Sequence, residues 1–463
     1  MDPSLSLAVA AGKVTAATIR RLGRGGGTTL PGRVSMRIDA HALQKLSASL
    51  DRGSILVAGT NGKTTTSTLL REILRADGVE VVANRAGSNL VWGLTASVVE
   101  DAGLGGGARA QAGVFEVDEA VLPAAVEAIA PRLVVITNLF RDQLDRYGEL
   151  ESSSAAISAA LAALPSAATA LLCADDPRVA ALADGLRANV VFYGVNDPVE
   201  GQVEVPHAAD ARFCPRCGSA LEFERVYAGH LGHYRCPTGD FRRPQPDVLA
   251  ARVEFDGLEG QRVEARGLEL DGAPLEVPLS GIYNSYNILA AAAAARLFGV
   301  PAPAIAPALS LFKPAFGRLE KVDVEGRAVR LMLAKNPAGF NEVLRAARVL
   351  GQGKHFAVVL NDRIADGRDV SWIWDVDFEL LADAETVVVG GDRALDMRVR
   401  LKYAGIDPSR LLVAETPGAT LDAIVAGTAP GDEVFVLPTY TAMLDLRAEM
   451  VRRGYLEAFW KGR

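Results

Sequence analysis

The 463-residue sequence predicts an α/β protein with a parallel-rich sheet in each of two successive domains. Three observations carry this prediction. Apolar strand-like runs alternate with helical segments along most of the chain, a Gly-rich turn joins the first strong strand to a helix, and the alternation breaks once, between about 200 and 280. The break predicts an inserted Cys-rich ribbon, and the strands beyond it predict a Rossmann-like C-terminal α/β domain.

The elements of the first half follow in order. An apolar and then basic stretch predicts an N-terminal helical segment over residues 1–50. The βαβ rhythm starts after it, with helices predicted over 64–78 and 153–165. The predicted strands are 54–59, 113–117, 132–138, 168–174 and 189–194. We therefore assign the first domain to residues 51–318.

The second half begins with the break in this rhythm. Cysteine pairs, prolines and alternating strands at 251–257 and 261–272 predict an inserted antiparallel element, with the ribbon itself over 212–245. A helix is predicted over 284–299, and KPAFGRLEKV is predicted to be a hinge. Five more strands are then predicted, at 329–334, 355–361, 386–391, 410–414 and 433–438. They place the second domain over residues 319–463.

Composition narrows the class of protein. The net charge of −7 argues against a general nucleic-acid binder, and no apolar run reaches the ~20 residues that span a bilayer. The basic residues of the N-terminal stretch follow its apolar part, the reverse of a secretory signal. The four cysteines do not form a disulfide framework. These features predict a cytoplasmic protein.

The turn after the first strand, in GSILVAGTNGKTTT, has the context of a phosphate-binding loop. Backbone N–H groups and a helix N-terminus can hold phosphates, the lysine can pair with outer phosphate oxygens, and the following threonine can bind Mg²⁺. A tight turn with a helix cap is the alternative interpretation. The candidate residues are Gly59, Thr60, Asn61, Gly62, Lys63, Thr64 and Thr65.

This short G-T-N-G-K-T-T form resembles the Mur ligase superfamily of ATP-dependent amide-forming enzymes. Three further stretches agree in order: FEVDEA, TNLFRDQLDRYGE and GIYNSYNILAA. The resemblance implies that Glu116 helps hold Mg²⁺ and that Asn287 lies near adenine; a solvent-facing strand-end carboxylate is the alternative for Glu116. The other matching residues are Asn138, Asp142, Asn284 and, in the hinge motif GRLEKV, Arg318.

Departures from the superfamily pattern narrow the resemblance. Only about 50 residues precede the loop, where many relatives carry a domain that binds UDP. The stretch that often reads D-H-x-D is D-Q-L-D here, and no lysine lies between Arg146 and Pro165. A-K-N-P at 334–337 replaces a D-Y-A-H-x-P-like motif. With the Cys-rich insertion and NDRIADGRDVSWIWD, the whole chain resembles the MurT family, the ligase subunits of lipid II isoglutaminyl synthase.

The resemblance implies a reaction and a partner. ATP would activate the α-carboxylate of D-glutamate in the lipid II stem peptide as an acyl phosphate, and ammonia would convert it to D-isoglutamine. The five histidines and four cysteines of this chain form no glutaminase motif. The resemblance therefore implies a heterodimer with a separate GatD-like glutamine amidotransferase, acting on lipid II at the membrane surface, with ATP and Mg²⁺ as cofactors.

The ribbon offers a candidate zinc site. Cys214 and Cys217 have the spacing of one half of a tetrahedral site, but Cys236 is followed by Gly239 where a fourth cysteine would complete it. His230, His233 or Asp240 could supply a substitute ligand, or the site could stay open. Zinc binding is left as an open alternative, and the remaining cysteine, Cys173, is predicted to be buried packing.

The loop after the strand at 355–361 is predicted to face the partner. The MurT resemblance implies that Asp369 completes the Cys-His pair of the glutaminase as its orienting acid. The alternative is that Asp369 caps a helix or solvates the loop, and Asp366 is the next candidate. Trp372 and Trp374 are predicted to suit an interface.

Two other function classes stay open. A stand-alone amino-acid-adding Mur or folylpolyglutamate-type ligase is disfavoured by the short N-terminus and the altered A-K-N-P motif. A nucleotide-binding scaffold without chemistry, such as a membrane-surface partner that uses the N-terminal basic helix, is disfavoured by the set Lys63, Thr64 and Glu116.

Overall fold

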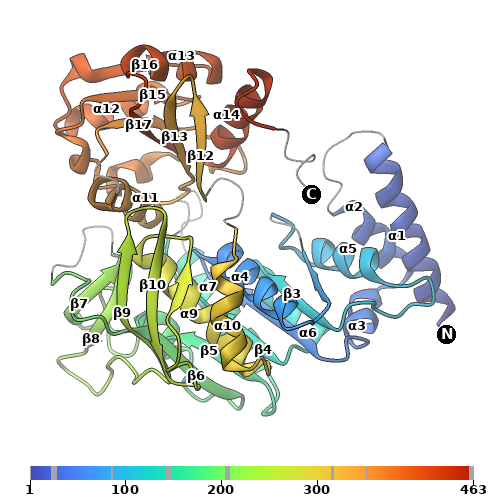
Figure 1. Ribbon diagram of the computed structural model, residues 1–463. Coiled ribbons are helices and arrows are strands. Elements are labelled where there is room, and N and C mark those ends of the chain that lie inside the picture. Colours follow the sequence, from blue (N-terminus) through green and yellow to red (C-terminus); the bar gives the residue numbers. More distant parts are fainter. Residues whose placement is uncertain are drawn as a thin grey trace.

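The computed structural model describes residues 2–21, 29–84, 87–141, 149–203, 209–313, 318–350 and 353–457. Two parallel-rich sheets, one above the other in Figure 1, organise these residues. The α/β class predicted from the sequence is therefore confirmed.

Within the described part of the N-terminal segment, three helices precede the first strand: α1 (Pro3–Arg21), α2 (Leu30–Ile38) and α3 (Ala42–Ser47). The first two pack against α5 (Val91–Asp101) at glycines where no side chain fits. A Cβ on Gly32 would lie 1.9 Å from the Trp92 carbonyl oxygen, and a Cβ on Gly12 would lie 2.3 Å from Ser35 Oγ. The N-terminal helices are thereby fixed closely to the first domain.

The first domain contains a nine-stranded sheet in the order β11-β10-β9-β6-β5-β4-β1-β3-β2. Its central strands are apolar, β-branched and buried on both faces, as expected where helices cover a parallel sheet. In this sheet the neighbours in the run β9-β6-β5-β4-β1-β3-β2 are parallel, whereas β10 runs antiparallel to β9 and β11. The strands are β1 (Gly53–Ala58), β2 (Val81–Ala83), β3 (Ala112–Glu116), β4 (Leu133–Ile136), β5 (Thr169–Cys173), β6 (Asn189–Val195), β9 (Val248–Asp256), β10 (Gly260–Arg266) and β11 (Leu275–Val277).

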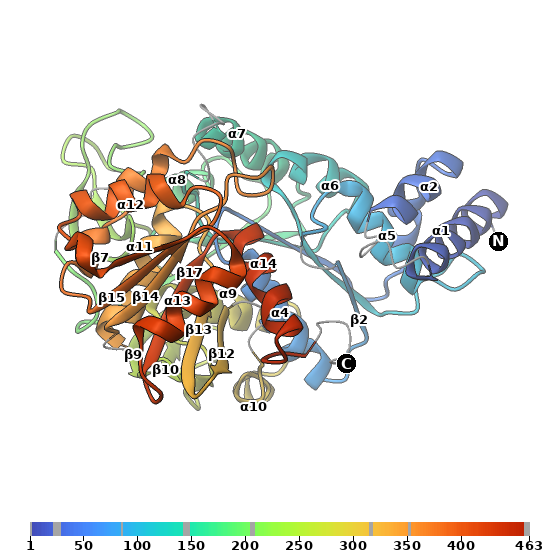
Figure 2. The same ribbon diagram turned by 90° about the horizontal axis from the view of Figure 1, so that it is seen from above.

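Helices cover this sheet, and α4 and α9 pack against each other beside it (Figure 2). The six consecutive alanines in α9 are all fully buried, because their small side chains let neighbouring backbones approach. The remaining helices of this domain are α4 (Lys63–Ala76), α6 (Leu122–Ile129), α7 (Glu149–Ala162), α8 (Pro177–Ala181), α9 (Ile282–Leu297) and α10 (Ala302–Ser310).

The predicted insertion divides into two parts. Strands β7 (Glu222–Ala228) and β8 (Leu231–Arg235) form a separate two-stranded sheet that carries the cysteine segment. The strands from β9 onward instead extend the main sheet, because β9 pairs in parallel with β6 at Tyr193↔Val248. The predicted antiparallel pairing is therefore confirmed for β9 to β11, but the prediction that these strands form a separate insertion was wrong, and the zinc-ribbon assignment stays a prediction.

The second domain contains a six-stranded sheet in the order β12-β13-β17-β14-β15-β16, parallel except for the first pair. Its strands are β12 (Arg318–Val324), β13 (Arg327–Met332), β14 (His355–Val359), β15 (Thr386–Gly390), β16 (Leu411–Ala414) and β17 (Glu433–Pro438). Its α-helices are α11 (Pro337–Arg345), α12 (Ala394–Tyr403), α13 (Pro417–Gly427) and α14 (Tyr440–Arg452). The predicted hinge overlaps β12, and its residues 314–317 lie outside the described part.

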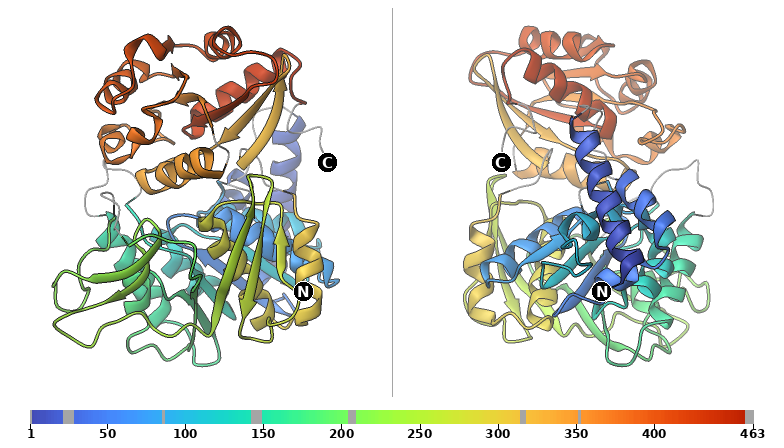
Figure 3. Two further views of the ribbon diagram at one scale, coloured as in Figure 1. Left: turned by 60° about the vertical axis from the view of Figure 1, so that its left-hand side comes forward. Right: turned by 90° about the vertical axis from the view of Figure 1, so that its right-hand side faces the viewer.

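At the junction of the two domains, where α11 lies between the sheets (Figures 1 and 3), side chains of each domain pack into the core of the other. Leu258, in the turn between β9 and β10, packs in the hydrophobic core of the second domain. Ala338 on α11 packs in the core of the first. Arg330 on β13 pairs with Glu259 across the junction and with Glu433 in its own sheet. The domains are therefore in contact through both apolar and charged groups.

Candidate active site

The phosphate-loop candidate connects β1 to α4 and depends on two glycines with positive φ. At Gly59 (φ 120°) a Cβ would lie 2.3 Å from Thr137 Oγ1, and at Gly62 (φ 86°) it would lie 2.0 Å from Asn287 Oδ1. Any other residue at either position would strain the backbone and clash with a neighbour. The loop therefore has the close backbone approach that a phosphate-binding turn needs.

Lys63 is the first residue of α4, and its ammonium group is held inside the loop. Its Nζ donates to the Gly59 carbonyl at 2.5 Å and to Glu119 Oε1 at 2.8 Å. Glu119 lies in the 3₁₀ helix that follows β3, and both side chains are nearly buried. Sequence reasoning missed Glu119, although it stands three residues after Glu116 in FEVDEA.

Thr64 and Glu116 form a hydroxyl and carboxylate pair beside this lysine. Thr64 Oγ1 donates to Glu116 Oε2 at 2.8 Å. Asn84 fixes the backbone of Glu116 on both sides, donating to its carbonyl and accepting from its N–H, each at 2.9 Å. Hydroxyl and carboxylate oxygens are suitable ligands for Mg²⁺, so these two residues fit the predicted metal position. Thr65, the next residue, is buried in α4.

Asn138 holds the loop backbone from the end of β4. Its Oδ1 accepts from the Asn61 N–H at 2.9 Å, and its Nδ2 donates to the Asn61 carbonyl at 3.1 Å. Thr60 Oγ1 donates to the Phe140 carbonyl at 3.0 Å. The loop is thus braced by hydrogen bonds, which limits the reorganisation needed when phosphates bind.

The two asparagines of GIYNSYNILAA lie on α9 behind the loop. Asn287 accepts from Thr66 Oγ1 at 3.3 Å and donates to Asn284 Oδ1 at 3.1 Å, and Asn284 donates to the Ser280 carbonyl at 2.7 Å. Asn287 is buried against Gly62. It therefore supports the loop directly, and its predicted contact with adenine stays a prediction.

A buried aspartate pair that sequence reasoning missed braces the same edge of the sheet. Asp176 accepts from the Leu139 N–H at 2.7 Å, next to Asn138. Asp175 accepts from Tyr286 on α9 at 2.6 Å and from Arg243 at 2.7 Å. The motif C-A-D-D-P after β5 is a signal for such a site, because polar residues at the carboxyl ends of parallel strands meet at one edge.

The second domain reaches the loop through the A-K-N-P stretch. Asn336 is the N-cap of α11, where its Oδ1 accepts from the Gly339 N–H at 2.8 Å. Its Nδ2 donates to Asn61 Oδ1 at 3.1 Å. The stretch that departs from the amino-acid-adding ligases therefore contacts the phosphate loop.

A cavity of about 220 Å³ lies at the same junction of domains. Tyr227, Phe255 and Tyr283 line it from the first domain, and Glu342 and Arg345 line it from α11. Burial raises the pKa of Glu342 to about 7, although Arg345 and the Gly229 N–H act in the opposite direction. A carboxyl group at the junction of the domains is therefore partly protonated near neutral pH.

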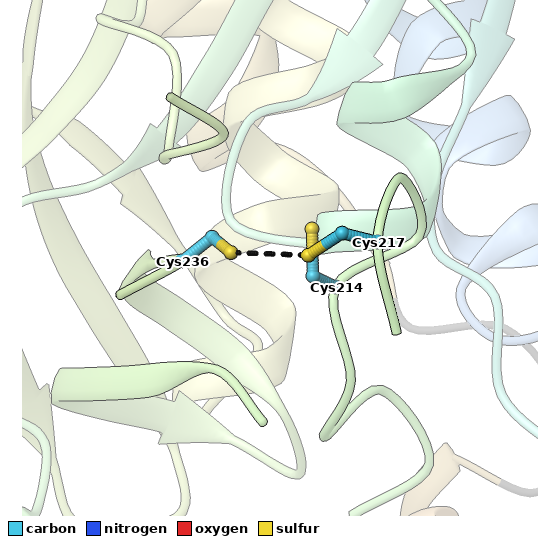
Figure 4. A group of neighbouring side chains, drawn as sticks. All are labelled: Cys214, Cys217 and Cys236. Carbon is cyan, nitrogen blue, oxygen red and sulfur yellow. Dashed lines mark hydrogen bonds between the residues drawn. The ribbon is translucent and has the colours of Figure 1, made fainter. Parts of the chain in front are cut away.

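The three ribbon cysteines converge in space, as Figure 4 shows. Their Sγ atoms all lie within 4.8 Å of one another, and those of Cys217 and Cys236 are 3.4 Å apart. Hydroxyl groups of Ser219 and Thr238 stabilise the Cys217 thiolate and lower the pKa of Cys217 to about 6. With Cys214, the cluster supplies three of the four ligands of a tetrahedral site.

The substitute ligands considered for this site lie elsewhere. His230 is fully buried, with Nε2 3.2 Å from Asp176 Oδ2 and its ring 4.3 Å from the Phe140 ring. His233 Nε2 lies 3.0 Å from the Val195 carbonyl oxygen. Among the described residues, neither these histidines nor Asp240 joins the three cysteines. Cys173, predicted to be packing, is fully buried in β5.

Asp369 lies at the edge of a cavity of about 330 Å³ on the second domain. Its Oδ1 accepts from the Ser371 N–H at 2.8 Å, and this hydrogen bond lowers the pKa of Asp369. The side chain therefore also makes the local capping contact named as the alternative. The other residues of the cavity include Trp374, Arg393 and Val399.

Two expectations for this loop were wrong. Trp372 is only 1% exposed because it packs against Phe340 in the core, whereas Trp374 is 52% exposed. Asp366 is also buried, and it accepts from the N–H and Oγ1 of Thr441. Asp366 is therefore committed to the fold and is not accessible to a partner.

The side chains of two predicted site residues, Asp142 and Arg318, lie outside the described part of the structure. Asp142 lies outside the described residues, as do the rest of the D-Q-L-D stretch and Arg146. Arg318 is the first residue of β12, but its side chain also lies outside the described part.

Comparisons with known proteins agree with this geometry. Two family models match: the Mur ligase middle domain over residues 57–214 and the MurT ligase C-terminal domain over residues 333–443. The chain is 31% identical to the MurT subunit of lipid II isoglutaminyl synthase (glutamine-hydrolyzing) from Staphylococcus aureus strain N315, covering 92% of this chain and 93% of that protein. It is 32% identical to the MurT subunit of the same enzyme from Streptococcus pneumoniae, covering 98% of each.

A solved structure supports the fold. The MurF ligase from Thermotoga maritima, crystallised with ADP, aligns with a TM-score of 0.64 at 16% identity, covering 91% of this chain and 85% of that one. At this identity the likeness establishes a shared Mur ligase fold, and the fold class predicted from the sequence is confirmed.

Proposed function

The chain belongs to the MurT family of Mur-type ligases, and from this premise we propose that it is the ATP-dependent ligase subunit of a lipid II isoglutaminyl synthase. The observation that carries the proposal is the contact between the phosphate loop and the domain that matches the MurT family. Asn336, inside the matched range 333–443, donates to Asn61 in the loop. A nucleotide held by the first domain would therefore face a MurT-type second domain.

The proposed reaction amidates the α-carboxylate of D-glutamate in the lipid II stem peptide. A carboxylate is a poor electrophile at neutral pH, so one of its oxygens must first become a phosphate leaving group. ATP is the phosphoryl donor, and ammonia then displaces phosphate to leave D-isoglutamine. Peptidoglycan synthesis is the process that this reaction serves.

The residues of the loop have separate parts in this chemistry. Lys63 would turn from Glu119 to the outer phosphate oxygens and offset the charge that builds up during transfer. Thr64 and Glu116 would hold Mg²⁺, which when bound neutralises phosphate charge. The braced backbone from Gly59 to Gly62 would position the phosphates by its N–H groups.

The three-cysteine cluster is proposed as a structural metal site. Three thiolates would fit a thiophilic ion such as Zn²⁺ and would leave one of its four positions to another ligand. A Cβ on Gly239 would lie 3.9 Å from Cys236 Sγ, so Gly239 borders the cluster. The cluster lies at the ends of the two-stranded sheet, because Cys214 and Cys217 precede β7 and Cys236 follows β8.

Ammonia is proposed to come from a GatD-like glutaminase subunit. The two relatives are named as subunits of a glutamine-hydrolysing enzyme. In this chain Cys173 is fully buried, and among the described residues no histidine joins the three cysteines of the cluster, so these cysteines lack the histidine base of a glutaminase.

The surface around Asp369 is the proposed docking site for that subunit. Trp374 and Val399 line the Asp369 cavity, and the rings of Trp374 and Tyr403 are 5.7 Å apart. Three α12 residues are exposed apolar or aromatic side chains: Leu395 at 59%, Val399 at 49% and Tyr403 at 72%. An exposed apolar patch beside a carboxylate fits a partner that uses this carboxylate in its own active site. Asp369 would orient the partner's histidine.

Reconstitution tests the function. The chain is purified with and without the glutaminase, supplied with ATP, Mg²⁺, glutamine and lipid II, and the product is analysed by mass spectrometry. The proposal predicts exchange of one hydroxyl for an amino group, with strict need for ATP. A product carrying an added amino acid would instead support the stand-alone amino-acid-adding ligase.

A further inference from the structure

The N-terminal helices differ in charge from the rest of the chain. Residues 1–50 contain seven Lys and Arg against two Asp, a net charge of +5, although the whole chain carries −7. The two aspartates, Asp2 and Asp39, both pair with Lys45. Arg20 on α1 pairs with Glu100 on α5, so the positive charge of the segment lies mainly on its other arginines, which include Arg33 and Arg37 on α2.

Helix α1 presents an apolar stripe to solvent. Leu7 and Val14, seven residues apart and so on one helix face, are 61% and 66% exposed. The opposite face, with Val9 and Ala16, is buried against the body of the protein. The outer face therefore carries two exposed aliphatic side chains, with the exposed polar residues Ser4 and Thr18 at its ends.

Helix α2 and the start of α5 add a basic and aromatic part. The Arg33 guanidinium lies 4.8 Å from the centre of the Trp92 ring, and Trp92 is 42% exposed. Leu30 is 48% exposed, and Arg37, one turn beyond Arg33, is exposed on the same side of α2. The close backbone packing at Gly32 fixes this arrangement.

This N-terminal surface, made by Leu7, Val14, Leu30, Arg33, Arg37 and Trp92, lies far from the proposed docking site for the glutaminase. In Figures 1 and 2, α1 and α2 lie at one end of the molecule and α12 lies at the other. A partner bound around Asp369 would therefore leave the N-terminal surface free.

We propose that the N-terminal surface binds the surface of an anionic phospholipid bilayer. The inference rests on the proposed function, whose substrate has a lipid carrier. Exposed aliphatic side chains, an interfacial tryptophan and arginines are the groups that hold a peripheral protein at a bilayer surface. Among the described helices, none is long and apolar enough to cross a bilayer.

Vesicle flotation of the chain with its partner tests this inference. Vesicles of phosphatidylcholine alone are compared with vesicles of equal parts phosphatidylcholine and phosphatidylglycerol. We expect binding only to the anionic vesicles, with loss at high salt. The double variant Arg33→Glu, Arg37→Glu should bind at least about 25-fold more weakly.

A matched control has the same change in charge elsewhere. Arg262→Glu with Arg266→Glu alters two exposed arginines on β10, away from α1 and α2, and should keep vesicle binding. A second variant, Leu7→Ser with Val14→Ser, should also bind weakly and tests the apolar stripe without changing charge. Melting curves establish that each variant is folded.

Enzymatic readouts separate this inference from the proposed function. In the surface variants, amidation of lipid II in vesicles should fall while amidation of a water-soluble stem-peptide substrate stays unchanged. Full vesicle binding by both surface variants, or equal loss in the β10 control, would overturn the inference. If the unmodified complex binds anionic vesicles but amidates neither substrate, the proposed function is wrong, whereas the inference that the N-terminal surface binds the bilayer remains supported.

Discussion

The Lys63–Glu119 ion pair predicts an unusual response to mutation. Glu119→Gln should tighten ATP binding by about tenfold, because the carboxylate competes with the triphosphate for the same ammonium group. At 2.8 Å and an effective dielectric constant of about 20, the attraction is about 6 kcal/mol before desolvation. Desolvation of both charges offsets most of this, so a net term of about 1–2 kcal/mol is available to the nucleotide.

The same substitution should destabilise the nucleotide-free protein. Removing one partner of a nearly buried pair leaves the other charge uncompensated, at a cost of about 3 kcal/mol. Lys63 keeps its hydrogen bond to the Gly59 carbonyl, which places the cost at the low end of that range. ATP should therefore raise the melting temperature of the variant more than that of the unmodified protein.

Calorimetric titration with a non-hydrolysable ATP analogue and melting curves with and without it measure both effects. Glu127→Gln on α6 is the matched control, because Glu127 is exposed and this substitution removes the same charge at the protein surface. Weaker nucleotide binding by Glu119→Gln, at unchanged stability, would refute the competition and assign Glu119 to the nucleotide itself.

Four further predictions address the other sites. Glu116→Ala should lower ATP-driven amidation by about 100-fold or more while leaving glutaminase binding intact, as measured by turnover and co-purification. Asp369→Asn should lower glutamine-driven amidation by about 10⁴-fold, whereas ammonium salt at alkaline pH should still drive the reaction. The raised pKa of Glu342, about 7, means that the folded state binds this proton more tightly than the unfolded state. The free energy of unfolding should therefore rise as pH falls from about 7 to 4.5. Glu342→Gln should remove this part of the pH dependence, as measured by denaturant midpoints. Gly239→Cys should complete the cysteine cluster and raise bound zinc and its resistance to chelators, as measured by elemental analysis.

Local signals were sufficient for the parts of the site that are continuous in sequence. The loop between β1 and α4 combines an apolar strand, two glycines and a lysine, and the structure places these residues as that pattern predicts. The strand runs of both sheets were predicted for the same reason, because β-branched residues on fully buried strands give unbroken apolar segments. The sequence therefore determined the class of the fold.

Features that depend on pairing between distant segments were not predictable. Strand β9 alternates in burial like an antiparallel strand, yet its parallel pairing with β6 joins it to the main sheet. Trp372 and Trp374 are two residues apart in one loop, and only the packing of Phe340 decides that one is core and the other surface. Glu119 has no signal of its own, because its role depends on the position of Lys63.

The A-K-N-P stretch connects the chemistry of the nucleophile to the geometry of the junction. An amino-acid-adding ligase has to bind the carboxylate or side chain of its incoming amine. Ammonia has neither group, so the corresponding position here is free to serve another role. Asn336 uses it to cap α11 and to donate to Asn61, which links the second domain to the loop that would hold the triphosphate. Under the proposed function, the supply of ammonia is left to a separate glutaminase, which we propose docks at the surface around Asp369.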